Sequence, residues 1–365
     1  MIQIFLGVMV ILIILMLFYL WKRFQKFNFI KKIAGEKKWL LRLLSAIPIL
    51  IIIVFGYYNV INTVIVAIHL MIFWAIFDFV GFLVKKIAHK EAKIYWQGIL
   101  TLIVTAIYLS IGWYSAHHVW ETQYALETDK DLGMDSLRIV QISDSHVGAT
   151  FHWQGFAKHM KTIQKTNPDI IVVTGDFVDD DTSKGDMIKC CESLGKMKTT
   201  YGIYMIYGNH DKGYFTYRNF TTKELEDELQ KNNIILLQDE VTLIDDKFYL
   251  IGRQDRTESD RMSAEDLMKG LDTSKYMIML DHQPNDYDNE SATAADLVLS
   301  GHTHGGQLIP LGIIGLLSGA NDREYGMETR NDTTFIVNSG ISDWAIKFKT
   351  GTFSEYGMID IKMKS

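Results

Sequence analysis

The first third of the chain consists of long apolar stretches, whereas the remainder alternates short apolar runs with polar segments. Four of these stretches approach the roughly 20 residues that cross a bilayer as a helix. They cover residues 2–20, 40–58, 61–84 and 94–115. Trp39, Trp96 and Trp113 lie near their ends, as in the aromatic belts of membrane proteins. We therefore predict a four-helix transmembrane domain over residues 1–117, and we expect the first stretch to be a retained anchor.

The loops between these stretches differ in charge. The link between the first two carries many Lys and Arg residues against Glu36 alone, and the link between the last two carries four lysines against Glu91. Residues 1–120 hold 12 Lys or Arg against 3 Asp or Glu, and the remainder holds 25 against 40. Because basic loops stay in the cytoplasm, we expect an integral plasma-membrane protein in which everything after about His117 is extracytoplasmic. The acidic remainder has no basic stripe, so we expect no nucleic-acid partner.

Three further residue types have competing explanations. Asp78 lies inside the third apolar stretch, where an ionisable residue indicates a transport function, a partner in helix packing, or a position near enough to the cytoplasmic face to reach water. His69 would lie on nearly the opposite face of that helix, so the two residues form no obvious proton relay. Cys190 and Cys191 offer no disulfide framework, and we interpret them as helix residues near a core rather than as a redox pair.

The second part of the chain predicts an α/β domain. Residues 118–136 are polar and unpatterned and are predicted to form a linker to a domain over residues 137–365. Short apolar runs predict strands at residues 137–142, 170–174, 202–207, 234–237, 241–244, 248–252, 277–280, 297–299, 335–337 and 356–361. Helices are predicted at residues 155–166, 185–198, 223–231 and 264–271. Strands that alternate with helices and then crowd together predict a layered α/β fold around β-sheet.

Polar clusters follow several of the predicted strands. They are Asp144-Ser145-His146, Gly175-Asp176-Phe177-Val178-Asp179, Gly208-Asn209-His210-Asp211, Asp281-His282 and Gly301-His302-Thr303-His304. Each cluster supplies carboxylate, amide or imidazole groups, and none supplies a thiolate. The carboxyl ends of strands in an α/β sheet meet at one edge, where such folds usually bind ligands. The sequence therefore predicts a metal site at this edge.

The ordered set D-x-H, G-D-x-x-D, G-N-H-D, H and G-H-x-H resembles the calcineurin-like metallophosphoesterase family, of the membrane-anchored bacterial type. The resemblance covers about residues 137–365 and implies a four-layer αββα fold. It also implies two metal ions, with one group of ligands for each and a carboxylate between them. The first group would be Asp144, His146 and His304; the second would be Asn209, His282 and His302; the bridge would be Asp176.

The resemblance further implies how the remaining polar residues act. His210 would stabilise the transition state or protonate the leaving oxygen, and Asp211 would orient His210. Asp179 would support the site from behind the ligands. Two cations about 3.5–4 Å apart neutralise phosphate charge, activate a water and clamp the attacking and leaving oxygens. Mixed nitrogen and oxygen ligands suit Mn, Zn or Fe better than Mg or Ca.

The substrate is less defined than the chemistry. We expect a hydrolase for phosphate ester or pyrophosphate bonds, acting on a phosphoester that is lipid-linked or part of the cell envelope. Residues 214–220 and 308–317 are candidates for a groove that takes an acyl or prenyl chain, and ordinary core packing is the alternative for both. Two other functions stay open: a membrane-anchored metal-binding sensor or scaffold with an idle phosphoesterase fold, and a transporter for which Asp78 is the only indication.

Overall fold

The computed structural model describes residues 2–89, 92–215 and 217–364, without the side chains of residues 2–6 and 9. Lys90 and Glu91 of the predicted basic loop, and Thr216 of the predicted groove, therefore lie outside the described residues. The chain divides into two compact units, Met1–Ile111 and Gly112–Ser365. We call them the N-terminal unit and the C-terminal unit.

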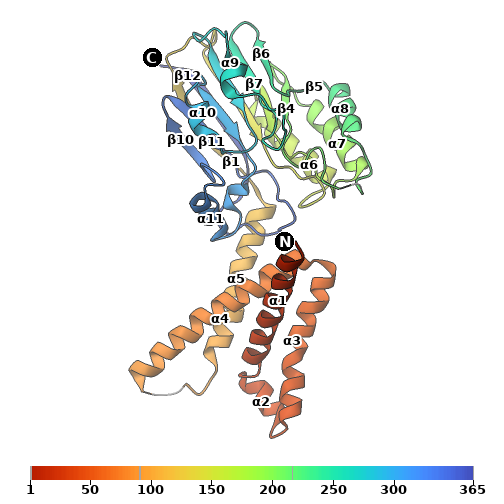
Figure 1. Cartoon of the computed structure of the whole chain (residues 1–365), viewed down its shortest axis with the longest axis vertical. Helices are drawn as coiled ribbons and strands as arrows, with labels where there is room; N and C mark the ends of the chain where they lie inside the picture. Colours follow the sequence, from red (N-terminus) through yellow and green to blue (C-terminus); the bar gives the residue numbers. More distant parts are fainter. Residues whose placement is uncertain (1, 90–91, 216, 365) are drawn as a thin grey trace. The chain divides into compact units, whose positions relative to one another are not determined.

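The N-terminal unit is helical (Figure 1). It contains α1 (Ile2–Phe24), α2 (Asn28–Ala34), α3 (Lys38–Tyr58), α4 (Val60–Ala88) and most of α5 (Trp96–His117). Within the described residues, α3, α4 and α5 are long and apolar enough to cross a membrane. The first predicted span is helical in α1, although some of its side chains lie outside the described set. The prediction of an α-helical membrane region ahead of an α/β domain is confirmed.

Asp78 takes part in helix packing within the N-terminal unit. Arg23 Nη1 of α1 lies 2.7 Å from Asp78 Oδ2 of α4. Tyr95 Oη lies 3.5 Å from the other carboxylate oxygen and accepts a hydrogen bond of 2.9 Å from Trp74 Nε1. His69 Nδ1 lies 2.8 Å from a carbonyl of its own helix. The carboxylate therefore ties α1 to α4, which is the structural alternative that the sequence left open.

Two six-stranded sheets form the C-terminal unit. The first sheet has the order β1 (Val119–Thr128), β12 (Ser354–Met363), β2 (Ser136–Ile142), β3 (Ile170–Thr174), β4 (Ile203–Ile206), β5 (Ile234–Leu236). The second has the order β10 (Gly326–Arg330), β11 (Thr333–Val337), β9 (Leu297–Ser300), β8 (Tyr276–Leu280), β7 (Phe248–Gly252), β6 (Glu240–Ile244). Strands β2 to β5 run parallel, and so do β7, β8, β9 and β11. Parallel strands of one sheet end at the same edge, so loops from separate strands can meet there.

Three apolar clusters divide the unit into four layers. One cluster joins the first sheet to α6 (Trp153–Ile163), α7 (Lys184–Gly195) and α8 (Thr222–Lys231). A second lies between the sheets, and a third joins the second sheet to α9 (Ala264–Met268) and α10 (Tyr287–Glu290). Strands such as β3 and β8 are buried on both faces, which explains their continuous apolar sequences. Figure 1 shows the helices on the outer faces of the two sheets. The predicted α/β fold and its αββα layers are confirmed.

Residues 118–136 are not simply the predicted linker, because they contain β1. This strand pairs in parallel with β12, from Val119 opposite Ser354 to Thr128 opposite Met363. It is an edge strand whose side chains alternate between exposed and half-buried, so it lacks the apolar run of a central strand. Strand β10 and the short helices α10, η2 (His304–Gly306) and α11 (Leu311–Ser318) also lie outside the predicted elements. β1 depends on a partner distant in sequence, whereas β10 pairs with the adjacent β11.

Candidate metal centre

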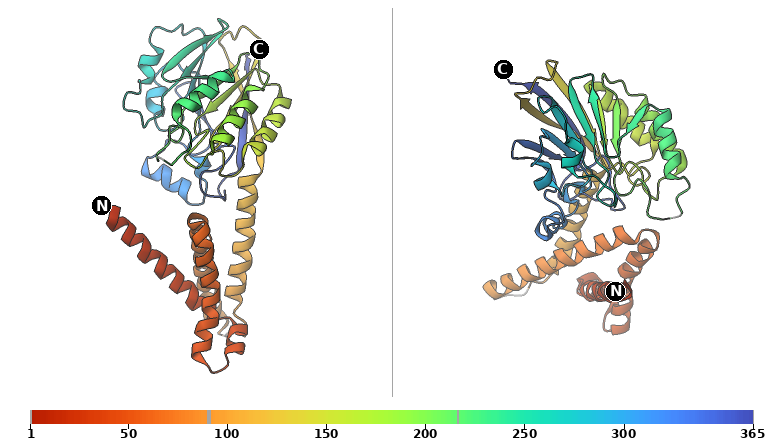
Figure 2. Two further views of the ribbon diagram at one scale, coloured as in Figure 1. Left: turned by 90° about the vertical axis from the view of Figure 1, so that its right-hand side faces the viewer. Right: turned by 45° about the horizontal axis from the view of Figure 1, so that its top comes forward.

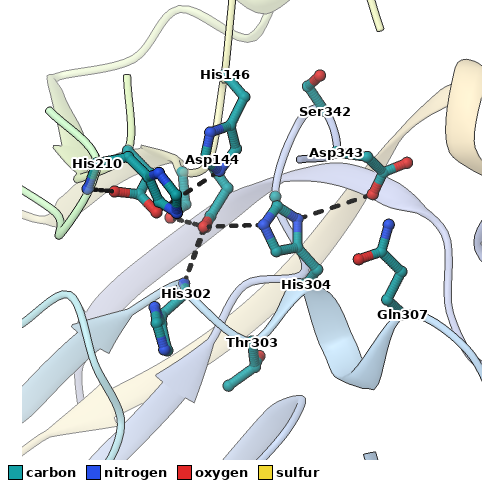
Figure 3. Close-up of polar contacts among 12 residues, drawn as sticks. Asp144, His146, His210, His302, Thr303, His304, Gln307, Ser342 and Asp343 are labelled. Atoms are coloured by element: carbon teal, nitrogen blue, oxygen red, sulfur yellow. Dashed lines mark hydrogen bonds and ion pairs between the residues drawn. The ribbon is translucent and has the colours of Figure 1, made fainter. Parts of the chain in front are cut away.

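The polar clusters meet where the central strands end. Asp144 follows β2, Asp176 follows β3 and Asn209 follows β4, three neighbouring parallel strands of the first sheet. His282 follows β8 and His302 follows β9, which pair in parallel in the second sheet. The loops of both sheets therefore contribute to one site, part of which is shown in Figure 3.

Asp144, His146 and His304 form a first group of possible ligands, whose donor atoms lie within 4.8 Å of one another. His304 Nε2 lies 3.6 Å from Asp144 Oδ1, and the rings of His146 and His304 stack with centroids 5.2 Å apart. Figure 3 shows His304 directed towards Asp144. All three residues are buried. These three residues are the ones that the family resemblance assigns to one metal ion.

Asp176, His282 and His302 form a second group, again with donor atoms within 4.8 Å of one another. His282 Nε2 lies 3.2 Å from Asp176 Oδ2 and 3.1 Å from Asn209 Oδ1. The amide nitrogen of Asn209 donates to Tyr214 Oη at 2.8 Å, which leaves its carbonyl oxygen facing the group. The structure thus brings Asn209, His282 and His302 together, as the resemblance implies, and adds Asp176 to them.

The imidazole nitrogens are arranged as in metal ligands. His282 Nδ1 lies 2.8 Å from Thr174 O and donates to it, and Nε2 faces the oxygens of Asp176 and Asn209, where a cation would bind. His146 Nδ1 lies 3.3 Å from Asp179 Oδ2. Its Nε2 is buried and has no hydrogen-bond partner among the described residues. A buried imidazole nitrogen without a partner is costly in an apo protein and fits a metal ion.

The backbone at the ligands is strained. Asp144, His146, Asp176, His302 and His304 all have positive φ, between 34° and 70°. Non-glycine residues rarely adopt this left-handed conformation, and clusters of such residues are typical of functional sites. Glycines allow the loops to come close: a Cβ at Gly301 would overlap Ser143 Oγ and Asp144 Oδ2, and one at Gly208 would overlap Asp176 Oδ1. The positive φ values and the close contacts between the loops both favour a site that binds a ligand.

His210 lies beside the two groups rather than within either. Its backbone N–H donates to Asp176 Oδ1 at 2.8 Å, and its half-buried ring lies 5.1 Å from the ring of His146. The rings of Tyr214 and Trp344 flank it at 5.0 and 5.5 Å. Burial lowers the pKa of His210. A neutral imidazole still has one N–H to donate to a substrate oxygen.

Asp211 contacts the backbone of two loops of the site. Its fully buried carboxylate accepts hydrogen bonds from the backbone N–H groups of Asp176, Val178 and Gly208, at 2.8, 3.0 and 2.7 Å. These bonds tie the loop after β3 to the loop after β4. Asp211 therefore fixes the loops that carry Asp176 and His210, and its orientation of His210 stays a prediction.

Asp343 and Lys349 belong to the site, and the sequence reasoning missed them. Asp343 Oδ1 lies 3.7 Å from His304 Nδ1 and 3.2 Å from Lys349 Nζ, and both residues are fully buried (Figure 3 shows Asp343). They lie in the loop that follows β11. The signal was present, because the polar run from Asn338 to Asp343 follows an apolar strand, as the other clusters do.

The electrostatics of the site favour cation binding. Burial lowers the pKa of His302, and it lowers that of His304 to about 3, so both imidazoles stay neutral, the form that binds metals. Burial opposes the ionisation of Asp144, but the neighbouring histidines His304 and His282 lower its pKa below the usual range. Burial opposes protonation of the other two histidines, but Asp179 raises the pKa of His146 and Asp176 raises that of His282. Carboxylates and imidazoles in two groups are a donor set that fits divalent metal ions.

Comparisons with known proteins identify the same region. A family model described as calcineurin-like phosphoesterase matches residues 137–306. The chain is 30% identical over 287 residues to the transmembrane protein with metallophosphoesterase domain of Danio rerio, which covers 73% of this chain and 63% of that protein. It is 30% identical over 276 residues to an uncharacterized metallophosphoesterase of Campylobacter jejuni, with 73% and 70% covered. A further uncharacterized metallophosphoesterase, from Aquifex aeolicus, is 30% identical over 196 residues, with 52% and 71% covered. The chain thus spans less than two thirds of the Danio rerio relative.

Proposed function

Because the chain belongs to the calcineurin-like metallophosphoesterase family, we propose that it hydrolyses phosphate ester or pyrophosphate bonds with the help of two divalent metal ions. The observation that carries this proposal is the position of Asp176. Its Oδ2 lies 3.6 Å from His146 Nε2 in the first group and 3.2 Å from His282 Nε2 in the second. A carboxylate between two groups of ligands is suited to bridge two cations.

Each side chain then has a separate task. Asp144, His146 and His304 would hold one ion, Asn209, His282 and His302 the other, and Asp176 both. Bound Mn, Zn or Fe would supply the positive charge that neutralises phosphate oxygens and makes a water nucleophilic. His210, next to both groups, would donate its N–H to a phosphoryl oxygen or to the leaving oxygen. Asp179 would keep His146 oriented, and Asp211 would keep the two loops in register.

The candidate membrane spans support a membrane location for this chemistry. The basic loops between the predicted spans favour a plasma-membrane protein with an extracytoplasmic C-terminal unit. A lipid-linked or cell-envelope phosphoester is the substrate class that suits such a location. The fold does not select between monoester, diester and pyrophosphate, so the first assays should include all three.

The proposal is tested with the full chain, purified, stripped of metal and then titrated with Mn²⁺ or Zn²⁺. We expect metal-restored hydrolysis of an aryl phosphodiester, monoester or pyrophosphate. His210→Ala should lower turnover at least about 100-fold, the usual range for a positioned proton donor, while the metal content stays that of the wild type. Asp176→Asn should lose both turnover and bound metal, because it removes charge between the two groups.

A histidine outside both groups provides the matched control. His152→Ala changes an imidazole whose side chain is 68% exposed, and it should leave turnover and metal content unchanged. Full activity in Asp176→Asn would contradict the two-metal assignment. Binding of two metals without turnover of any of the three ester classes would favour the idle scaffold over the enzyme.

A further inference from the structure

Helix α11 carries an apolar surface that points away from the C-terminal unit. Its five large side chains are strongly exposed: Leu311 49%, Ile313 58%, Ile314 55%, Leu316 46% and Leu317 84%. Ile309, just before the helix, is 55% exposed. Leu308 is buried, but the exposure of the residues after it excludes ordinary core packing, the alternative that the sequence left open, for residues 309–317. A contiguous apolar surface of this kind marks a contact with a partner or a membrane.

The opposite face of α11 is made of glycine. A Cβ at Gly312 would lie 2.9 Å from Gly306 Cα, and a Cβ at Gly315 would overlap the Glu324 carboxylate. The Thr303 hydroxyl donates to Glu324 O at 2.6 Å, so this face rests against the loop between His302 and His304. An ordinary surface helix directs its apolar side inwards. Helix α11 does the reverse, as a helix that lies in a membrane interface does.

Hydrogen bonds connect the residues just before α11, which we call its base, to the end of α5, a candidate membrane span. Helix α5 meets the length and composition of a span, and its last turn, Gly112–His117, belongs to the C-terminal unit. The Lys349 backbone N–H donates to Gly112 O at 2.9 Å, and the Thr350 backbone N–H donates to Gln307 O at 2.8 Å. The Thr350 hydroxyl in turn accepts from the Ile309 backbone N–H at 3.1 Å. A short chain of hydrogen bonds therefore joins the end of the span to the base of α11.

Within the C-terminal unit, Figures 1 and 2 show α11 at the same end as the last turn of α5. A helix of 22 residues is ~33 Å long at 1.5 Å per residue, enough to cross the bilayer core of ~30 Å, so its last turn reaches the interface. Trp113 and Tyr114 on this turn are 50% and 54% exposed, and Trp344 is 44% exposed. Exposed aromatic side chains of this type are typical of the membrane interface.

We propose that α11 inserts its apolar face, Leu311 to Leu317, into the interfacial layer of the bilayer that α5 crosses, with lipid as its partner. The helix would then hold the mouth of the metal centre at the lipid surface, because η2 with His304 leads directly into it and Trp344 lies against His210. A phosphoester carried by a lipid would then reach the centre without leaving the membrane, and this consequence rests on the proposed function. The insertion of α11 does not depend on the proposed function.

The test uses the full chain in lipid nanodiscs, with an environment-sensitive fluorophore on Leu317→Cys. Leu243→Cys on β6 is the matched control, because Leu243 is an exposed leucine of the same unit, at 39%. The native Cys190 and Cys191 are fully buried, and labelling of the unmodified chain measures their background. We expect lipids with a nitroxide group near the ester linkage to quench the emission at 317 by more than half and to leave that at 243 unchanged.

Each other outcome overturns the proposal. Equal quenching at 317 and 243 means that α11 stays in water. A blue-shifted emission at 317 that lipid nitroxides do not quench means that a protein, such as a second copy of this chain, covers the helix. The quenching does not depend on catalysis, so it decides the insertion even if no phosphoester is hydrolysed.

A second measurement addresses the lipid substrate. We expect Leu317→Gln combined with Ile313→Gln to lower turnover of a phosphoester on a long-chain lipid several-fold. Turnover of a short soluble aryl ester should stay that of the wild type, which also shows that the variant is folded. Leu243→Gln should change neither rate. Equal loss on both substrates would contradict a role of α11 in lipid access.

Discussion

Single buried side chains hold the loops of the candidate metal centre together, and Lys349 is one of them. Its ammonium group donates to Ser339 O at 2.6 Å and to Ser342 O at 3.2 Å, and it lies 3.2 Å from Asp343 Oδ1. Asp343 faces His304 in turn. A lysine with a fully buried side chain requires such partners, since an unpaired buried charge is expensive. Lys349 therefore links the loop after β11 to a candidate metal ligand.

Lys349→Met should destabilise the protein strongly. The change keeps the length of the side chain but leaves Asp343 as an unpaired buried carboxylate, which costs about 3–5 kcal/mol of folding free energy. Thermal unfolding in detergent, compared with Lys362→Met on an exposed position of β12, measures the effect. Equal melting temperatures for the two variants would show that the Lys349 network contributes little.

Among the elements, α6 combines core packing with a titratable group. Phe156, Met160 and Ile163 are buried in the first core cluster. His159 lies on the same helix, half-buried, with its ring 5.3 Å from that of Phe151. Burial, helped by Lys158 and His118, lowers the pKa of His159 from 6.5 to about 4. The folded helix therefore favours the neutral imidazole.

This shift predicts a loss of stability in mild acid. Because the pKa of His159 is lower in the folded than in the unfolded state, the unfolded state takes up the proton first. Its contribution to stability is present above pH 6.5 and is lost as the pH falls from 6.5 to about 4. The melting temperature of the wild type should thus fall more between pH 7.5 and pH 5 than that of His159→Gln. Parallel decreases in the two proteins would count against this assignment.

At the scale of the whole molecule, the charge of the loops and the apolar helices together predict on which side of a membrane the C-terminal unit lies. The helices α3, α4 and α5 meet the criteria for membrane spans within the described residues, and residues 25–37, between α1 and α3, hold four lysines against Glu36 alone. The orientation follows from this asymmetry rather than from the fold of the C-terminal unit, which would be the same on either side.

The orientation predicts which cysteines a membrane-impermeant maleimide reaches. Asp135→Cys, exposed in the C-terminal unit, should be labelled in intact cells. Lys37→Cys, exposed in the loop before α3, should be labelled only after permeabilisation. The reverse pattern would place the metal centre in the cytoplasm and would remove the argument for a cell-envelope substrate.

The sequence by itself determined the classes of element and the donor set. The membrane helices could be predicted because a bilayer requires long apolar stretches, and β3 and β8 because strands buried on both faces are apolar throughout. The candidate ligands could be named because each cluster follows a strand, and parallel strands deliver such clusters to one edge. These signals are local, so a single stretch of chain contains them.

Only the tertiary structure decided the rest. β1 is a strand because β12, near the other end of the C-terminal unit, pairs with it. Asp343 lies opposite His304, and the carboxylate of Asp211 receives three backbone N–H groups, because separate loops converge in space. The apolar run of α11 is exposed because its glycines, not its leucines, pack against the protein. For β1 and the site loops the deciding energy comes from partners distant in sequence, and for α11 it comes from close backbone packing, which a hydrophobic pattern does not record.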